Sequence, residues 1–180
     1  MKYLYLAAPP GTDVEAFLAV CARVQDEFDV PVAPIEMPDL EFAYDANRRQ
    51  YASFPVLELL ARLCPPDALK LLAITECDLF IPVLTFVFGH AQLGGRVGVV
   101  SFARLRQEFY GLAPHREVFL ERAIKEALHE TGHTFGLVHC ADRNCAMSLA
   151  TNVRQIDLKQ AAFCPACSAR LARRKEEELS

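Results

Sequence analysis

The feature that most constrains this chain of 180 residues is a histidine-rich run in its last third. His129, Glu130 and His133 form the pattern H-E-x-x-H, and His139 follows. On a helix, positions i and i+4 share one face, so His129 and His133 can direct both imidazoles at one metal ion. Gly136 can adopt the left-handed backbone that ends a helix, and the turn would bring His139 back as a third ligand. The spacing therefore predicts a helix that ends beside a three-histidine metal site.

Three protein ligands leave one tetrahedral position open for water, which is the arrangement of a catalytic rather than a structural zinc. Glu130 lies next to the ligand pair, where it can act on the metal-activated water as a general base without binding the metal. The alternative is an ordinary amphipathic helix that happens to carry two histidines. His139, Gly136 and the later Met147 make that alternative much less favourable.

Four of the seven cysteines form a second constellation. Cys140 directly follows the third histidine, Cys145 comes five residues later, and Cys164 and Cys167 form a C-x-x-C pair. Four thiolates close a tetrahedral shell, so they suit a structural zinc that leaves no place for substrate. Two disulfides are the alternative, and an odd number of cysteines fits disulfide pairing poorly.

The run H-E-x-x-H-x-x-G-x-x-H-C-x4-C-x-M, followed by C-x-x-C, resembles the archaemetzincins, a family of metzincin-like zinc metallopeptidases. Sixteen residues separate Met147 from Cys164, one fewer than the family spacing, which a loop tolerates. Some metzincins carry a tyrosine two residues after the methionine, where this chain has Leu149. The segments 86–89 and 93–97 also look like the family, so the resemblance is expected to span the whole chain.

The resemblance implies an α+β, zincin-like fold: a mixed β-sheet with an antiparallel edge strand, an active-site helix and a small zinc-stapled C-terminal lobe. It implies two zinc ions per chain, with Met147 as a hydrophobic floor beneath the histidines. It also implies peptide-bond hydrolysis by a zinc-activated water, with Glu130 as the general base. The substrate is expected to be a peptide or protein that pairs as an extended strand with residues 84–91. Three residues of that segment are expected to contact it: Phe86, Phe88 and Gly89.

The length fits one metallopeptidase domain over residues 1–180. Within it we expect a sheet and helix lobe over 1–139 and a C-terminal lobe over 140–180. A net charge of −4 argues against nucleic acid as a partner. No segment is apolar for long enough to span a bilayer, and the N-terminus lacks the pattern of a signal peptide. We therefore expect a cytoplasmic protein without a membrane partner; the sequence predicts neither oligomeric state nor substrate identity.

Apolar periodicity supplies the remaining elements. A stripe at i, i+3, i+4, i+7 and i+8 predicts a helix over 116–134. Further helices are expected over 13–27 and 53–63. Strands are expected over 2–8, 30–37, 71–80, 84–88 and 96–102, and residues 39–53 are expected to form a surface loop. His90 is interpreted as a surface histidine.

Two rival functions remain open at this point. One is a protein that binds zinc and peptide with little or no hydrolysis, because ligands and a base do not establish a productive cleft. The other is an adaptor that docks a partner macromolecule through its four-cysteine unit. Cleavage of a peptide library would separate a peptidase from both rivals.

Overall fold

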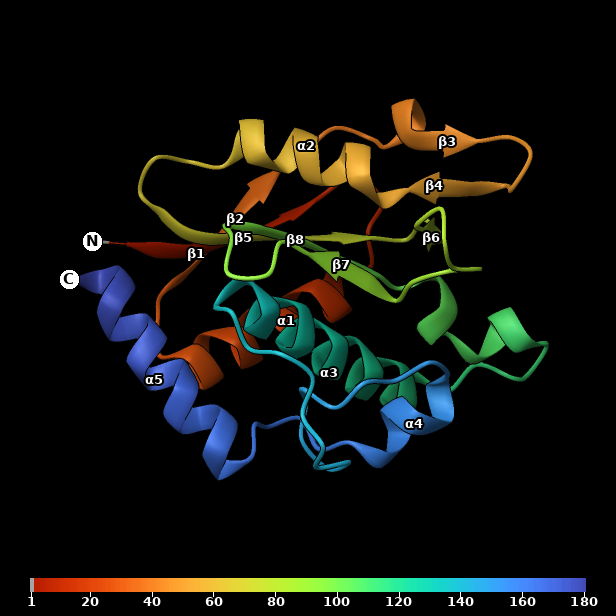
Figure 1. The fold of residues 1–180 in the computed structure, drawn as a ribbon. Coiled ribbons are helices and arrows are strands. Elements are labelled where there is room, and N and C mark those ends of the chain that lie inside the picture. Colours follow the sequence, from red (N-terminus) through yellow and green to blue (C-terminus); the bar gives the residue numbers. More distant parts are fainter. Residues whose placement is uncertain (1) are drawn as a thin grey trace.

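The computed structural model describes residues 2–180, and a five-stranded sheet forms its centre (Figure 1). The strands lie in the order β2 (Val32–Glu36), β1 (Tyr3–Ala8), β5 (Ala68–Thr75), β8 (Val97–Ser101) and β7 (Gly89–Ala91). Four strands are parallel, and β7 runs antiparallel to β8 at one edge. This arrangement confirms the expected mixed sheet with an antiparallel edge strand.

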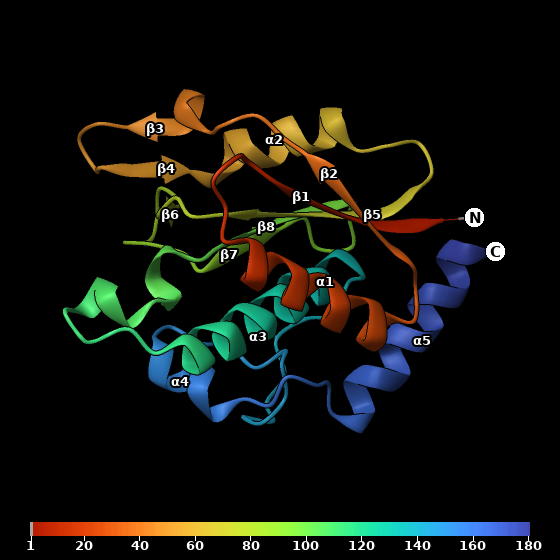
Figure 2. The same cartoon turned by 180° about the vertical axis from the view of Figure 1, so that it is seen from behind.

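Helices cover both faces of this sheet (Figures 1 and 2). The helices α1 (Val14–Phe28) and α3 (Arg116–Thr134) lie on one face, and α2 (Ser53–Leu63) lies on the other. Helix α4 (Val153–Leu158) lies beyond α3, on the side away from the sheet. Helix α5 (Pro165–Leu179) ends beside the sheet, where Glu178 pairs with Lys70 of β5. The α+β architecture expected from the sequence is therefore confirmed.

The central strand β5 is buried along its whole length, because both of its faces are covered. Successive side chains point to opposite faces, so Leu72 and Ile74 join the core beneath α1 and α3. Leu71 and Ala73 join the second core, beneath α2. In the edge strand β2, Pro34 is tolerated because a strand at the margin of a sheet needs fewer backbone donors.

Helix α3 is buried on nearly every side, since the sheet packs on one face and the C-terminal residues on another. It begins after His115, whose Nδ1 accepts a hydrogen bond from the Val118 N–H at 3.4 Å. It ends where Gly136 adopts a φ of 82°. The Gly136 and Leu137 N–H groups then donate to carbonyls of the last helical turn, at 2.9 and 3.1 Å. The predicted bounds of 116–134 are thus confirmed.

Two predictions fail around a second, three-stranded sheet of β3 (Tyr44–Asp45), β4 (Gln50–Ala52) and β6 (Leu79–Phe80). Residues 39–53 are not a loop, since they contain β3, β4 and a 3-10 turn. The strand expected over 71–80 is interrupted, because β5 ends at Thr75 and β6 pairs with β4 instead. The strands of this sheet have two or three residues each, too short for apolar alternation to be visible. The 3-10 helices of the chain are Glu41–Ala43, Ala103–Leu105 and Gln107–Tyr110.

The strand expected over 84–88 is also wrong, and the edge strand is confined to Gly89–Ala91. Side chains from β4 and from the turn between β3 and β4 donate hydrogen bonds to carbonyls of this segment. Arg48 donates to the Leu84 and Thr85 carbonyls at 2.6 and 3.1 Å, and Gln50 donates to Thr85 at 3.0 Å. The preceding segment is therefore held as a bent loop that leads into β7.

Residues from the C-terminal part belong to the same core as α1 and α3. Met147, Ile156, Phe163 and Leu171 are buried in it, and Phe163 packs edge-on against Phe28 at 5.7 Å between ring centroids. The expected division into two lobes at residue 139 stays a prediction, because residues on both sides of it share this core. Within residues 2–180, no helix combines the length and apolar composition needed to cross a membrane.

Candidate active site and metal centres

The three histidines of the motif converge at the C-terminal end of α3. His129 and His133 project from successive turns of the helix, and the turn at Gly136 returns the chain so that His139 faces them. One nitrogen from each ring lies within 4.8 Å of the other two. The Nε2 atoms of His129 and His133 are 3.0 Å apart.

Hydrogen bonds to the other ring nitrogens show that this cluster suits a cation. The Nδ1 atoms of His129 and His133 lie 2.8 and 2.7 Å from the carbonyls of Ala146 and Leu137. Carbonyl oxygens only accept, so both Nδ1 atoms carry the proton. Burial lowers the pKa of both rings and of His139, which favours neutral imidazoles. The Nε2 lone pairs of His129 and His133 then face each other. A zinc ion about 2.0–2.1 Å from each Nε2 atom would satisfy both lone pairs.

Glu130 is buried beside the histidines and faces the edge strand. A Cβ atom on Gly89 would lie 2.5 Å from Glu130 Cγ, so the backbone of β7 passes directly over the carboxylate side chain. Burial raises the pKa of Glu130 well above its ordinary value, and the nearby Glu126 carboxylate raises it further. Glu130 thus lies between the histidine cluster and the open edge of the sheet.

Met147 is fully buried against α3. Its sulfur would be 2.5 Å from a Cβ on Gly132, so the helix backbone rests directly on the methionine. The Met147 carbonyl accepts a hydrogen bond from the Cys140 N–H at 2.9 Å. The turn at Met147 is therefore bonded to the segment that follows His139.

The ion pair of Lys159 and Glu126 lies close to the site and was not predicted from the sequence. Lys159 Nζ lies 3.2 Å from Glu126 Oε1 and 3.3 Å from the Ala146 carbonyl, the same carbonyl that binds His129. Both side chains are almost fully buried, at 1% and 4% exposure. Glu126 lies one helical turn before Glu130, a spacing that could have placed it on the cleft face. Lys159 carries no comparable signal, because its partner is 33 residues away.

A cleft of about 560 Å³ opens above the histidines. One wall is the segment from Ile81 to Ala91, which includes the predicted Phe86, Phe88 and Gly89; the other includes Val138 and residues 149–151. His90 is a half-buried part of this wall, not a surface residue. Its Nδ1 is 2.8 Å from Ser53 Oγ, and its ring packs edge-on against Phe54.

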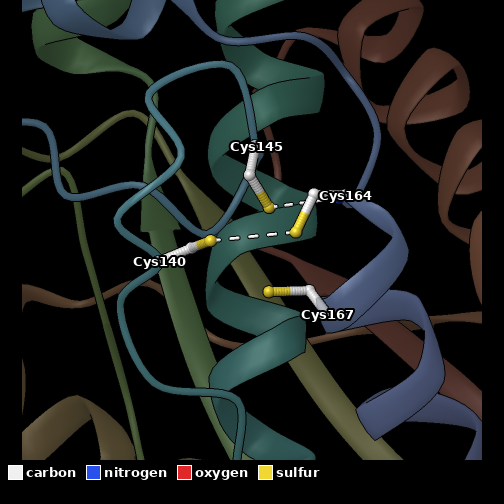
Figure 3. A group of neighbouring side chains, drawn as sticks. All are labelled: Cys140, Cys145, Cys164 and Cys167. Atoms are coloured by element: carbon white, nitrogen blue, oxygen red, sulfur yellow. Dashed lines mark hydrogen bonds between the residues drawn. The ribbon is translucent and has the colours of Figure 1, made fainter.

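The four cysteine sulfurs point toward a common centre and come from two segments, 140–145 and 164–167 (Figure 3). All lie within 4.8 Å of one another. The Cys140 and Cys164 sulfurs are 3.8 Å apart, too far for a disulfide bond of about 2.05 Å. Ligands about 2.3 Å from a tetrahedral zinc are themselves about 3.8 Å apart, so the geometry fits a closed zinc shell. All seven cysteines in the described part of the chain are free thiols.

Comparisons with known proteins find similar proteins over most of the chain. The model of peptidase family M54 matches residues 44–173. An archaemetzincin from Methanocaldococcus jannaschii is 41% identical over 149 residues, which cover 83% of this chain and 76% of the relative. The crystal structure of archaemetzincin from Methanopyrus kandleri superposes with a TM-score of 0.86 at 37% identity, covering 97% and 96% of the two chains. A zinc-dependent peptidase from Methanocorpusculum labreanum has a TM-score of 0.85 at 30% identity, covering 93% and 99%.

Fold and site together define a zinc metallopeptidase of the metzincin type. Two of the similar proteins are archaemetzincins, the family that the histidine and cysteine pattern resembles. The chain belongs to peptidase family M54.

Proposed function

We propose that this zinc metallopeptidase hydrolyses peptide bonds at the three-histidine site, with Glu130 as its general base. The observation that carries the proposal is the pair of facing Nε2 atoms of His129 and His133, with His139 beside them and Glu130 adjacent. His129, His133 and His139 would hold the catalytic zinc. When bound, zinc supplies a lowered pKa for water and polarisation of the scissile carbonyl.

The residues of the chain supply the remaining parts of the reaction. The carboxylate of Glu130 takes a proton from the attacking water and delivers it to the leaving amine. The carbonyls of Ala146 and Leu137 hold His129 and His133 in one tautomer and one orientation. Met147 takes no part in proton transfer and supports the helix at Gly132.

Strand β7 is the proposed docking edge for the substrate backbone. The Phe88 carbonyl and the Gln92 N–H both bond to β8. Because hydrogen-bonding directions alternate along a strand, the backbone groups of Gly89 and Ala91 point to the open edge. An extended peptide can satisfy these groups as an added strand. Gly89 leaves room for it above Glu130, since it has no side chain.

A structure with a peptide-like inhibitor tests this docking edge. We expect the inhibitor main chain to bond to Gly89 and Ala91 while its metal-binding group lies among the histidines. The expected strand is short, because β7 has only three residues. An inhibitor bound at the histidines whose main chain avoids β7 would contradict the edge-strand proposal.

Cleavage of an unbiased peptide library by the zinc-loaded protein tests the function itself. Hydrolysis that is lost with a chelator and restored with zinc favours the peptidase. A zinc-loaded protein that binds peptides but cleaves none favours the non-hydrolytic rival. Binding of a partner protein that depends on the four cysteines and ignores the cleft favours the adaptor.

Two zinc ions per chain are proposed, with separate ligand sets. His133→Ala should lower the zinc content by about one equivalent while the fold is retained, because the helix is held by its core contacts. Cys164→Ser should also lower it by about one equivalent but destabilise residues 140–180, because a structural zinc contributes folding free energy. Elemental analysis with thermal unfolding of both variants measures this. A wild-type chain that holds one zinc, or disulfides among these cysteines, would contradict the assignment.

A further inference from the structure

A second groove adjoins the catalytic cleft at the end where α3 stops. Its volume is about 370 Å³, and it lies between α5 and the turn of Gly136, Leu137 and Val138. Val138 also lines the catalytic cleft, so the two hollows share a wall. A peptide that extends beyond the histidines in this direction reaches the groove.

The groove is strongly basic in a chain whose net charge is −4. Helix α5 contributes Arg170, Arg173 and Arg174, and Glu177 is the one acidic residue that lines it. Glu177 forms an ion pair with Arg174, with 3.3 Å between Oε2 and Nη1. Between residues 2 and 180, the side chains of Arg170 and Arg173 have no ion-pair or hydrogen-bond partner. Two guanidinium groups are therefore available to an anion from outside.

The direction of the docking edge determines which half of a substrate meets these arginines. Gly89 lies over Glu130, and the turn after β7 packs against the helix end, where the Gly94 N–H donates to the His133 carbonyl at 2.9 Å. The C-terminal end of β7 therefore points toward Gly136 and the basic groove. A peptide added antiparallel to β7 places its N-terminal half at that end.

An exposed basic helix face is ordinarily just solvated, but here it forms one wall of a hollow next to the cleft. We propose that this groove binds acidic side chains of the substrate, on the N-terminal side of the bond that is cleaved. The proposal rests on the peptidase function proposed above and specifies its substrate class. Guanidinium groups suit this task, since their planar donors match carboxylates. Exposure to solvent makes the interaction sensitive to salt.

The test uses the full-length, zinc-loaded chain and matched peptides in which glutamate or glutamine is scanned through the half before the scissile bond. We expect glutamate to raise kcat/KM about threefold to tenfold over glutamine, mainly through KM, and the advantage to shrink as salt is added. Glutamate placed after the scissile bond should give no advantage. Equal rates for glutamate and glutamine at every position before the bond would overturn the proposal.

Charge-reversed variants locate the effect. Arg170→Glu and Arg173→Glu should each lower kcat/KM far more for the glutamate peptides than for the glutamine peptides, and so remove most of the preference for glutamate. Arg62→Glu, on exposed α2 across the sheet, makes the same change in net charge and should keep the preference. A preference that survives both groove variants, or disappears in Arg62→Glu, would show that the groove is not responsible.

Binding provides a readout that does not depend on hydrolysis. The affinities of labelled glutamate and glutamine peptides for the Glu130→Gln variant should show the same ratio, and Arg173→Glu should abolish it. If no peptide is cleaved but this ratio is present, the groove proposal stands and the hydrolytic function fails. If peptides are cleaved but the ratio is absent, the hydrolytic function stands and the groove proposal fails.

Discussion

Glu130→Gln is expected to lower peptide hydrolysis by at least the ~10²–10⁴-fold that general acid–base catalysis supplies. The substitution removes the proton acceptor but no proposed zinc ligand. Glutamine matches the carboxylate in size, so the close contact with Gly89 is preserved. Zinc content should stay near the wild-type value. Peptide affinity should change much less than the rate, because the lost interaction acts mainly in the transition state.

Three measurements on the same two proteins decide this: zinc content, peptide affinity and cleavage rate. Equal cleavage rates would point to a contaminating peptidase or to a different base. A large fall in zinc content would show that the residue supports the metal instead. The wild type and the variant should give the same circular dichroism spectrum, because the core around α3 is unchanged.

Lys159→Met is expected to destabilise the fold by about 3–5 kcal/mol, the cost of leaving a buried charge without its partner. The lysine is the ion-pair partner of Glu126 in a buried environment. Burial already raises the pKa of Glu126, so protonation of the carboxyl can absorb part of the cost. Urea unfolding of the zinc-loaded proteins measures the change.

The double variant Glu126→Gln with Lys159→Met separates the charge effect from a loss of packing. It leaves no unpaired charge, so most of the lost stability should return. The Ala146 carbonyl still loses the lysine donor in both variants. If the double variant is as unstable as Lys159→Met alone, the ion pair is not the origin of the effect.

The helix that carries the histidines could be predicted from sequence because all of its signals are local. The apolar stripe from Leu120 to Leu128 indicates the helix, and Gly136 marks its end. The histidine and cysteine clusters were likewise visible as spacings within short segments. The structure brings both sets together as those spacings suggested.

What could not be predicted depends on residues far apart in the chain. Strand β6 belongs to the small sheet only because β4 pairs with it, and Arg48 shortens the edge strand by bonding 36 and 37 residues away. Lys159 follows a helix in a polar stretch, where a lysine ordinarily faces water. Such partners are set by tertiary packing, and no periodicity in the sequence encodes them.

The adjacency of His139 and Cys140 has a consequence for how the site is assembled. His129 and His133 lie on α3, whereas His139 lies on the segment that leads directly into Cys140. Under the two-zinc proposal, loss of the zinc at the cysteines would let the segment around Cys140 open, while Met147, Ile156 and Leu171 stay in the core shared with α1 and α3. Each opening would move His139 away from His129 and His133 and so abolish hydrolysis. Metal supply to the cysteines would thus affect activity through the position of His139.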